Sequence, residues 1–503
     1  MNRNSRYQLF TFKSVVYIFQ SARLSVIPYL LAARTFYIYT RSAFGHYIPF
    51  IQLGRRLHSR DIRISMTVPS DILAELRSKG VLTPDDELHV FHVIDVDSLS
   101  MQITSSHGSQ LTIAQTLTKM MESQSPPAPG SSTSGPPKNI MQGLQMKLAG
   151  ILPGLKSYLS NISNVDLVII DYYVSPAAEV LADRQIPYCV FNTGAPLMAL
   201  SLLTLTASTP TDDAAGPSPM LDDFRNKAAM PAAFKEMTLE RKVILGKARG
   251  FILNSFAGLA DELVRDVQSD KYSLAGLNIF QIGPLFPEEE GTSTKEDQSG
   301  QKIIQWLDES APHSVIYVSF GTVATPSPPQ LTALCNTLLT LITRHHSRIL
   351  WSLPVSHHSY VADTLRTHPS VLLTSWTPQR LVLGHPALAL FVSHCGWNST
   401  LESLAMGVPV VGWPLFSDQY LNSQWLEDAG LGLRVRGTGL MGPTVRVVPE
   451  EEIVGIISRI LDGREEFAAA VGEWKKKIAD AMRKPSGSYY SEFDRLSADV
   501  LAI

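Results

Sequence analysis

The chain has 503 residues, of which 45% are hydrophobic and 18% are charged, a composition typical of a soluble globular protein. This length exceeds what one hydrophobic core usually holds, so we expect two domains. With 43 basic and 46 acidic residues the net charge is only −3, which excludes a broad basic surface for nucleic acid.

The three cysteines lie far apart in the chain, at Cys189, Cys335 and Cys395. Their number is odd and their spacing matches no zinc motif, which argues against disulfides and against a zinc site. The pattern favours a reducing compartment, and we expect a cytoplasmic protein.

Residues 1–34 differ in composition from the rest of the chain. Five basic residues interrupt an apolar, serine-bearing segment, and no acidic residue occurs before Asp61. This composition resembles an amphipathic organelle presequence or a basic membrane-surface helix, and it would allow a loose peripheral contact with a membrane. The alternative is an extension without fixed structure. The uncharged apolar runs are too short to cross a bilayer, and Lys13 interrupts the apolar core that a secretory signal would need.

From Thr35 onward, short apolar runs alternate with helix-forming segments. This alternation predicts doubly wound parallel sheets, with a strand over 36–39, a turn over 42–49, a helix over 50–59 and a second strand over 62–68. Further strands are predicted over 167–170, 188–191, 251–253, 314–320, 349–353, 371–375, 387–392 and 408–413.

Three segments interrupt the alternation. Residues 123–138 are rich in proline, serine and glycine and cannot bury a core, so we predict a disordered loop there, and residues 206–219 give a shorter example. Residues 286–301 are acidic and lack periodicity, and we predict that they link the two domains. The domains would then span residues 35–285 and 302–480.

The segment from Trp376 to Gln419 predicts a strand, a turn, a helix and a strand. Its apolar run 387–392 ends in a polar turn over 393–399, which leads into helix-forming residues 400–406. In such a unit the backbone N–H groups of the turn and the helix N-terminus carry partial positive charge. An anion is therefore expected there, and a phosphate is the most common one.

Side chains around this turn suit each part of a nucleotide sugar: a flat aromatic, a histidine, small hydrogen-bond donors, an acid and an amide. The segment closely resembles, without a gap, the signature box of the family 1 UDP-glycosyltransferases, particularly the plant natural-product type. The resemblance implies donor contacts from Trp376 to uracil; Gln379 and Glu402 to the ribose; His394, Asn398 and Ser399 to the diphosphate, with Gly396 in the same turn; and Trp397, Asp418 and Gln419 facing the sugar.

Other segments carry the same resemblance, which covers nearly everything from residue 35 onward. Residues 306–322 resemble the first strand of the nucleotide-binding domain, with Thr322 near the phosphate where serine is commoner, and residues 248–259 and 282–285 resemble the approach to the linker. The resemblance implies an α/β protein of the GT-B architecture, with two facing Rossmann-like domains. It also implies that a helix over 481–503 crosses back to the first domain.

Simpler interpretations exist for single residues. Ser399-x-x-Glu402 is also the pattern of a capping box, in which the glutamate satisfies its own helix N-terminus. Trp376 alone would be typical of a core aromatic, and His394 alone of a strand-end histidine. Only their shared register in one segment favours the donor-binding interpretation.

Transfer of a sugar to an alcohol needs a base, and the first half of the chain has a candidate in Gly45-His46-x-x-Pro49. Asp171 ends the apolar run 166–171 and could lie at the same sheet edge, where it would fix the imidazole tautomer. The resemblance assigns these roles to His46 and Asp171, although alone His46 could be structural and Asp171 could cap the next segment. Thr193 matches a sugar-contacting position, but a hydroxyl after a strand also makes turn bonds.

We therefore expect an inverting transferase that needs no cofactor and takes a UDP-sugar donor, with Gln419 resembling members that prefer glucose. No metal is expected, because no DxD-like acidic pair is suitably placed and because the helix terminus and His394 could neutralise the leaving diphosphate. The acceptor pocket would include residues 93–102 and 197–205, whose apolar character suggests a phenolic, flavonoid, terpenoid or sterol. We expect a monomer.

Two alternatives keep the fold and change the function. A nucleotide-sugar epimerase or hydrolase would use similar facing domains without an acceptor pocket, and a non-catalytic UDP-sugar-binding protein would keep only the donor segment. The presence of both His46 and Asp171 argues against the latter. A dinucleotide oxidoreductase is disfavoured because no G-x-G-x-x-G follows the first predicted strand.

Overall fold

The structure is a computed structural model that describes residues 35–39, 44–60, 62–68, 70–95, 155–163, 165–209, 232–272, 274–286, 295–322, 325–439 and 446–501. Several predictions therefore lie outside the described residues. They are the N-terminal extension over 1–34, the loop over 123–138, residues 210–219 of the second predicted loop and most of the segment 93–102.

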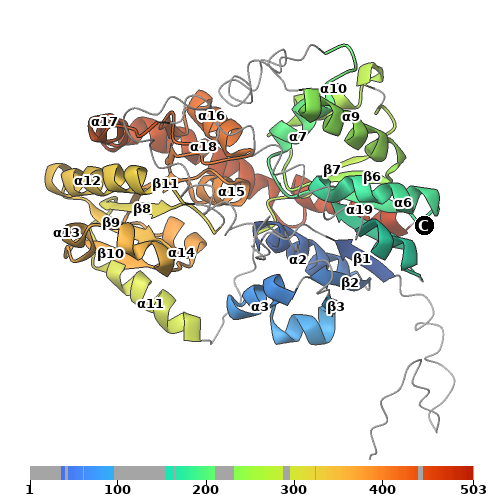
Figure 1. Ribbon diagram of the computed structural model, residues 1–503, viewed down its shortest axis with the longest axis horizontal. Helices are drawn as coiled ribbons and strands as arrows, with labels where there is room; N and C mark the ends of the chain where they lie inside the picture. Colours follow the sequence, from blue (N-terminus) through green and yellow to red (C-terminus); the bar gives the residue numbers. More distant parts are fainter. Residues whose placement is uncertain are drawn as a thin grey trace, which may run out of the picture.

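Two parallel sheets organise the described chain, one in each half (Figure 1). The first has the order β3-β2-β1-β4-β5-β6-β7. Its strands are β1 (Thr35–Tyr39), β2 (Arg63–Val68), β3 (Phe91–Asp95), β4 (Leu167–Asp171), β5 (Tyr188–Asn192), β6 (Gly250–Leu253) and β7 (Ile279–Gln281). The second sheet has the order β10-β9-β8-β11-β12-β13. Its strands are β8 (Val315–Ser319), β9 (Arg348–Ser352), β10 (Val371–Thr374), β11 (Leu388–Ser393), β12 (Val410–Gly412) and β13 (Gly432–Arg434).

Helices connect the strands of both sheets, which confirms the predicted α/β class. In the first half these are α2 (Phe44–His58), α3 (Ser70–Ser78), α6 (Glu179–Asp183), α7 (Pro196–Leu203), α9 (Ala232–Lys247) and α10 (Asp261–Val267), with shorter turns at Asp86–Val90, Tyr172–Ala178 and Asp270–Tyr272. The second half has α11 (Lys295–Asp308), α12 (Pro328–His345), α13 (Asp363–Arg366), α14 (Gln379–Leu383), α15 (Trp397–Met406), α16 (Gln419–Asp428), α17 (Glu450–Asp462), α18 (Arg464–Ala481) and α19 (Ser488–Leu501), with a short turn at Val355–Tyr360.

Apolar side chains on both faces of each sheet explain why its central strands could be recognised. In β4, Val168 and Ile170 pack into one hydrophobic cluster, and the alternate residues Leu167 and Ile169 pack into another on the opposite face. A parallel strand buried on both faces needs such a continuous apolar run. The second sheet is likewise covered on both faces by two clusters.

The strands that the sequence does not reveal are all at sheet edges. β3, β7 and β13 end their sheets, and each is short and contains polar residues. An edge strand needs less apolar surface than a central one, so its sequence pattern is weaker. Residues 93–95, predicted to belong to an acceptor loop, lie in β3.

Two helices begin earlier than predicted. α2 begins at Phe44, so most of the predicted turn over 42–49 is helical and His46 lies in the first turn of the helix. Gly45 and Pro49 suggest a turn locally, but α2 contains both. Similarly, α15 begins at Trp397, three residues before its predicted start.

The last helix returns to the first half of the chain, where α19 lies beside β7 (Figure 1). Tyr489, Phe493 and Leu496 join the hydrophobic cluster that also contains residues of α2. Arg56 stacks over the Tyr489 ring at 4.8 Å, and Arg60 forms an ion pair with Asp494.

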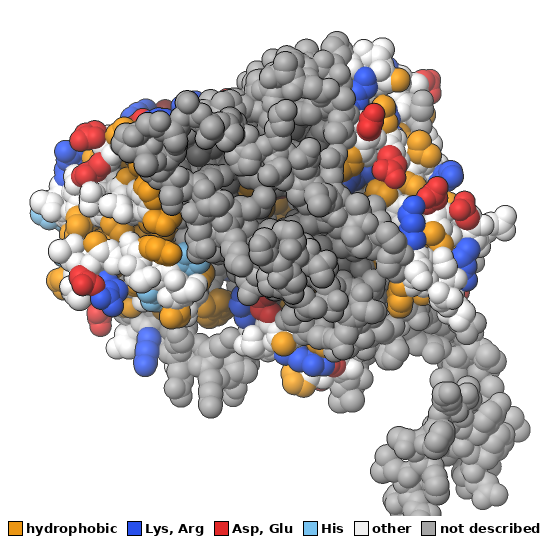
Figure 2. All heavy atoms as spheres, in the orientation of Figure 1, with side chains coloured by type: hydrophobic (Ala, Val, Ile, Leu, Met, Phe, Trp, Pro, Cys, Tyr) orange, Lys and Arg blue, Asp and Glu red, His pale blue; other side chains and the backbone are white. Residues whose placement is uncertain are grey.

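The predicted domain boundaries stay a prediction, although α11 begins at Lys295, inside the predicted linker. Over the described residues, no helix has a stretch long and apolar enough to span a bilayer. Figure 2 shows acidic and basic side chains interspersed over the visible described surface, as the small net charge leads one to expect.

Candidate active site

Three neighbouring strands of the first sheet bring a histidine, a carboxylate and a hydroxyl together. β1, β4 and β5 are adjacent, and His46 follows β1, Asp171 ends β4 and Thr193 follows β5. The His46 Nδ1 atom lies 2.6 Å from Asp171 Oδ2 and 2.9 Å from Thr193 Oγ1. The carboxyl ends of adjacent parallel strands meet at one sheet edge, which explains how residues 125 positions apart in the sequence come into contact.

Asp171 uses both of its carboxylate oxygens, and its side chain is fully buried. While Oδ2 faces His46, Oδ1 accepts a hydrogen bond of 2.8 Å from the backbone N–H of Tyr173 and so caps the turn Tyr172–Ala178. The capping role considered for Asp171 is therefore real and coexists with the contact to His46. The turn and the ring together fix the orientation of the carboxylate.

The contacts of His46 define its chemistry. A carboxylate can only accept a hydrogen bond, so the proton of the neutral imidazole belongs on Nδ1, and Nε2 is the basic atom. The ring is partly exposed, with 18% of its side chain accessible, and the Tyr173 ring packs edge-on against it at 5.3 Å between centroids. Thr193, predicted to contact the sugar, places its hydroxyl against the same Nδ1 atom.

At the other side of the site, β11 leads through a tight turn into α15. The N-cap of α15 is Gly396, which has no side chain to satisfy the first N–H groups of the helix. Those groups belong to a ten-residue helix and are free of side-chain capping, so they offer the partial positive charge that an anion requires.

His394 lies in this turn between two glycines. A Cβ atom added at Gly321 or Gly396 would lie 2.7 or 2.5 Å from His394 Nε2, so both positions must lack a side chain. Burial lowers the pKa of His394 to about 4, against the raising effect of a backbone hydrogen bond with Ser319. The ring is neutral at neutral pH. In the ligand-free protein the ring therefore offers a hydrogen bond and no charge, and the neutralisation of a leaving diphosphate by His394 stays a prediction.

Three residues of the predicted ribose and diphosphate sites form one network. Gln379 Nε2 donates to Glu402 Oε2 at 2.6 Å and to Ser399 Oγ at 3.0 Å, and Tyr317 Oη donates to Gln379 Oε1 at 3.1 Å. Burial raises the pKa of Glu402 to about 7, although the hydrogen bond from Gln379 opposes the shift.

The capping-box interpretation of Ser399 and Glu402 is wrong. Ser399 is the third residue of α15, two positions after the first, and the N-cap is Gly396. Glu402 lies within the helix, where its carboxylate accepts from Gln379 on α14. Glu402 therefore contacts a residue outside its own helix, as its predicted ribose-binding role requires.

The three residues predicted to face the sugar differ in which of their polar groups already bond to the protein. Asp418 Oδ2 accepts from the backbone N–H of Ala195 at 3.1 Å, and burial raises the pKa of this carboxyl. Gln419 Oε1 accepts two backbone hydrogen bonds, at 2.9 and 3.0 Å, so its amide would present only its NH2 group to a ligand. The Trp397 indole is buried and donates to Asn254 O at 2.8 Å, so the indole is not the part of Trp397 that meets a sugar.

Two further predicted donor residues lie at the ends of strands of the second sheet. Trp376 follows β10 and is partly exposed. Thr322 follows β8 and is exposed, directly after Gly321, whose φ of 75° places it in the left-handed region. Neither position conflicts with a ligand at the carboxyl ends of these strands.

The two halves touch where the site residues meet. Asn398 Nδ2 on α15 donates to Gly45 O on α2 at 2.9 Å, and Asp418 reaches Ala195 as described. A cavity of about 10 Å³ remains here, room for about one water molecule. It is lined by Ile48, Asn254, Leu285, Phe286, Asn398, Leu401 and Glu402.

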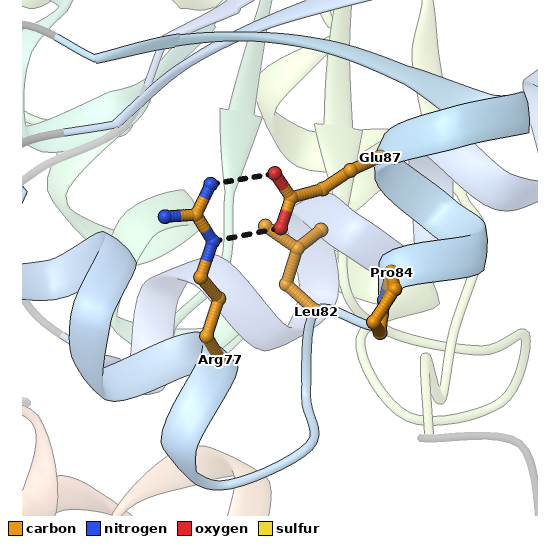
Figure 3. Close-up of a pocket in the computed structure, with 4 residues that line it drawn as sticks. All are labelled: Arg77, Leu82, Pro84 and Glu87. Atoms are coloured by element: carbon orange, nitrogen blue, oxygen red, sulfur yellow. Dashed lines mark hydrogen bonds and ion pairs between the residues drawn. The ribbon is translucent and has the colours of Figure 1, made fainter.

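A larger hollow of about 460 Å³ lies away from these residues, lined by Arg77, Leu82, Pro84 and Glu87 (Figure 3). Arg77 and Glu87 face each other across it through hydrogen bonds of 2.8 and 2.6 Å. The charges of Arg77 and Glu87 are thus paired with each other. None of the predicted site residues lines this hollow.

Sequence reasoning missed three residues that support the site: Tyr173, Tyr317 and Asn254. Asn254 directly follows β6, and its position at a strand end was the available signal. Tyr317 lies inside the apolar strand β8, and Tyr173 follows Asp171 in a buried turn. Neither tyrosine differs in pattern from a core aromatic.

Comparisons with known proteins give consistent results. Residues 283–442 match the family described as UDP-glucoronosyl and UDP-glucosyl transferase. Anthocyanidin 3-O-glucosyltransferase 7 of Manihot esculenta is 35% identical over 277 residues, which are 53% of this chain and 88% of the relative. Anthocyanidin 3-O-glucosyltransferase of Gentiana triflora is 34% identical over 259 residues, or 50% of this chain and 52% of the relative. The chain thus spans about half the length of the Gentiana relative.

Solved structures give the fold. The crystal structure of Medicago truncatula UGT71G1 complexed with UDP-glucose superposes with a TM-score of 0.69 at 20% identity, over 94% of this chain and 99% of that chain. Os79 from O. sativa, in complex with UDP, gives a TM-score of 0.66 at 22% identity over 93% and 100%. The predicted GT-B architecture of two doubly wound domains is therefore confirmed.

Proposed function

The chain belongs to the UDP-glycosyltransferase family, and on that premise we propose that it transfers a sugar, in the first instance glucose, from a UDP-sugar to a hydroxyl group of a small hydrophobic acceptor. One observation carries the proposal. The carbonyl of Gly45, the neighbour of His46, contacts Asn398 in the first turn of α15. The proposed base and the proposed anion-binding helix terminus therefore lie on two helices that contact each other.

In the proposed reaction, His46 Nε2 accepts the proton of the acceptor hydroxyl. The acceptor oxygen forms a bond to the anomeric carbon of the sugar while the bond from that carbon to the UDP oxygen breaks. Asp171 stabilises the imidazolium that forms, because its carboxylate already faces Nδ1 at 2.6 Å. General-base action of this kind typically contributes about 10²- to 10⁴-fold.

The leaving diphosphate would be stabilised by hydrogen bonds rather than by a side-chain charge. The uncapped N–H groups of α15 would direct their partial positive charge at the diphosphate. The neutral His394 ring has a single N–H and would donate it to the diphosphate in place of its bond to the Ser319 backbone. Gln379 and Glu402 would hold the ribose, and Trp376 the uracil. With the base on the first half and the leaving group on the second, a direct displacement inverts the anomeric carbon, so an α-linked donor gives a β-glycoside.

The acceptor class is supported by the relatives and by a limited surface on α7. Relatives from Gentiana triflora and Actinidia chinensis are named as anthocyanidin and flavonol 3-O-glucosyltransferases, which favours a flavonoid-like phenol. In α7, which covers most of the segment predicted to line the acceptor pocket, Leu197 and Ser201 are partly exposed and the other residues are buried. These two positions, one turn apart, are the part of α7 that could contact an acceptor.

An assay with the purified full chain tests the proposal. UDP-glucose, UDP-galactose and UDP-glucuronate would each be incubated with a flavonol, an anthocyanidin, a terpenoid alcohol and a sterol, with products identified by mass. The expected result is a hexose adduct from UDP-glucose whose anomeric proton shows the coupling of a β-glycoside. Release of UDP without acceptor would indicate a hydrolase, an altered UDP-sugar an epimerase, and binding of UDP without turnover a non-catalytic protein.

Two further properties stay part of this proposal. We propose a monomer, which light scattering would test. We also propose that residues 1–34 allow a loose contact with membranes, which flotation of the chain with anionic vesicles, before and after deletion of residues 1–30, would test.

A further inference from the structure

A proline inside α2 changes the hydrogen bonding of the helix next to His46. Pro49 lies within α2 and has no backbone N–H. In an α-helix the N–H of residue 49 would bond to the carbonyl of residue 45. The Gly45 oxygen therefore loses its ordinary helical donor, and in this structure it accepts a hydrogen bond of 2.9 Å from Asn398 Nδ2.

The Asn398 amide is held from its other end as well. Its Oδ1 accepts from Asn254 Nδ2 at 3.4 Å, and Asn254 Oδ1 accepts from the backbone N–H of Leu285 at 2.9 Å. Asn254 is buried, and its own backbone N–H donates to Asn192 O at 3.1 Å. This chain of bonds sets the amide with its nitrogen toward Gly45, since the opposite orientation would set two carbonyl oxygens against each other.

We propose that Asn398 is a positioning residue whose bond to the carbonyl left open by Pro49 sets the placement of His46 relative to the leaving group. This inference rests on the proposed function. Gly45 and His46 share the first turn of α2, so a displacement of that turn moves the imidazole. Asn398 is the second residue of α15, whose N-terminus would bind the diphosphate. One hydrogen bond therefore joins the base to the anion site.

Asn398 can fulfil this role and still contact a phosphate. An amide nitrogen carries two N–H donors, and the Gly45 carbonyl uses one of them. Transfer rates depend steeply on alignment, and a misplacement of about 1 Å can cost about 10²-fold. Pro49 thus keeps the Gly45 oxygen available for a partner on the opposite half of the protein.

The substitution Pro49→Ala tests the inference because it is expected to improve the helix and impair the enzyme. Alanine restores the N–H that competes for Gly45 O, and it is a better residue for a helix interior. We expect the melting temperature to stay the same or rise, kcat to fall by about three- to tenfold, and the dissociation constant of UDP to stay within about twofold, as the loss of one hydrogen bond implies.

Pro328→Ala is the matched control. Pro328 is the first residue of α12, and an N–H at this position would have no carbonyl acceptor within the helix. Restoring the N–H with alanine therefore frees or blocks no carbonyl, and this variant should keep the wild-type kcat. A purely structural role for Pro49 predicts an unchanged kcat together with any change in melting temperature. A Pro49→Ala enzyme with a kcat within about twofold of wild type would therefore overturn the inference.

A double-mutant cycle supplies an independent test. Asn398→Ala should lower kcat, and adding Pro49→Ala to it should lower kcat by less than about twofold more, since the bond is already lost. Full additivity of the two effects would overturn the inference even if each single variant is impaired. A wild-type chain that transfers no sugar from any donor would instead overturn the proposed function, and the inference with it.

Discussion

His46 and His394 lie at the carboxyl ends of strands in the two sheets, and their surroundings are opposite. His46 is partly exposed and faces the buried carboxylate of Asp171 at 2.6 Å. His394 is also partly exposed, but it is packed between Gly321 and Gly396 and has no carboxylate partner, and desolvation lowers its pKa to about 4. The same side chain thus suits proton transfer on the first half of the protein and neutral hydrogen bonding on the second.

The carboxyl groups of Asp171 and Glu402, one in each half, also differ in their partners. Asp171 lies between a backbone N–H and an imidazole, so its charge has two partners. The Gln379 amide donates to Glu402, but burial outweighs that bond and raises the pKa of this carboxyl to about 7. Near neutral pH the Glu402 carboxyl is therefore partly protonated, whereas the Asp171 carboxylate can form an ion pair with His46 when the base is protonated.

The largest effect is expected from variants that remove either His46 or the charge of Asp171. His46→Ala and Asp171→Asn should each lower kcat/KM by about 10²- to 10⁴-fold, because the first removes the base and the second removes the charge that stabilises the imidazolium. The dissociation constant of UDP, measured by calorimetry, should change by less than about twofold, since the donor side is intact.

His385→Ala provides the control for this pair of variants. His385 also faces an aspartate, with Nε2 at 3.1 Å from Asp308 Oδ1, but this pair lies outside the cleft and Asp308 is exposed. Its loss should leave kcat/KM unchanged. If His46→Ala abolished UDP binding as well as transfer, the assignment of His46 to proton transfer and of His394 to donor binding would be wrong.

How far the sequence could predict these two sites depends on whether their residues are contiguous. The donor side lies in one segment, so its motif identifies it without any knowledge of the sheet order. The contact between His46 and Asp171 depends on β1 lying beside β4 in the sheet, which no local pattern specifies. A local pattern also misplaced the start of α2, because Gly45 and Pro49 are common turn residues and here the helix contains both.

Two contacts of α2 could not be predicted at all. The bond from Asn398 to Gly45 depends on how two sheets dock, and the contact of Thr193 with His46 depends on the rotamer of a buried threonine. Sequence reasoning assigned both side chains to the donor. In the structure each also contacts α2.

The next largest effect is expected at Glu402, on the donor side. Glu402→Ala should weaken UDP binding by about ten- to a hundredfold, the cost of losing a hydrogen bond to a charged group, while the melting temperature should not fall because Glu402 does not cap its helix. Calorimetry and thermal melts measure both. A lower melting temperature with unchanged UDP affinity would return Glu402 to a structural role.

The pH dependence of the same residue sharpens the contrast. Because the folded-state pKa of about 7 lies above the ordinary 4.5, the folded ligand-free protein binds a proton that the unfolded chain has lost, and stability should fall as the pH rises from about 4.5 to about 7. Ribose hydroxyls would favour the ionised carboxylate, so UDP affinity should rise over the upper part of this range with release of protons. Glu402→Gln should remove both dependences.

A smaller effect is expected at His394. Its pKa of about 4 means that its charge does not change between pH 6 and 8, so it should contribute no pH dependence to UDP affinity there. His394→Gln keeps a neutral donor and should bind UDP within about threefold of wild type, whereas His394→Ala should weaken binding by about three- to tenfold. Equal losses in both variants would show that the ring acts through its shape and not through a hydrogen bond.

The smallest effect is expected at Thr193. Its substitution tests whether the hydroxyl acts on His46 or contacts the transferred sugar. In the structure Oγ1 lies 2.9 Å from His46 Nδ1, so Thr193→Val, which keeps the shape and removes the hydroxyl, should lower kcat by about two- to fivefold and leave the KM for the donor unchanged. If the hydroxyl contacts the transferred sugar, as the sequence predicts, the loss should include a raised KM for the UDP-sugar. Thr193→Ser restores the hydroxyl and should recover kcat in the first case, because the buried site leaves the smaller side chain facing the same nitrogen.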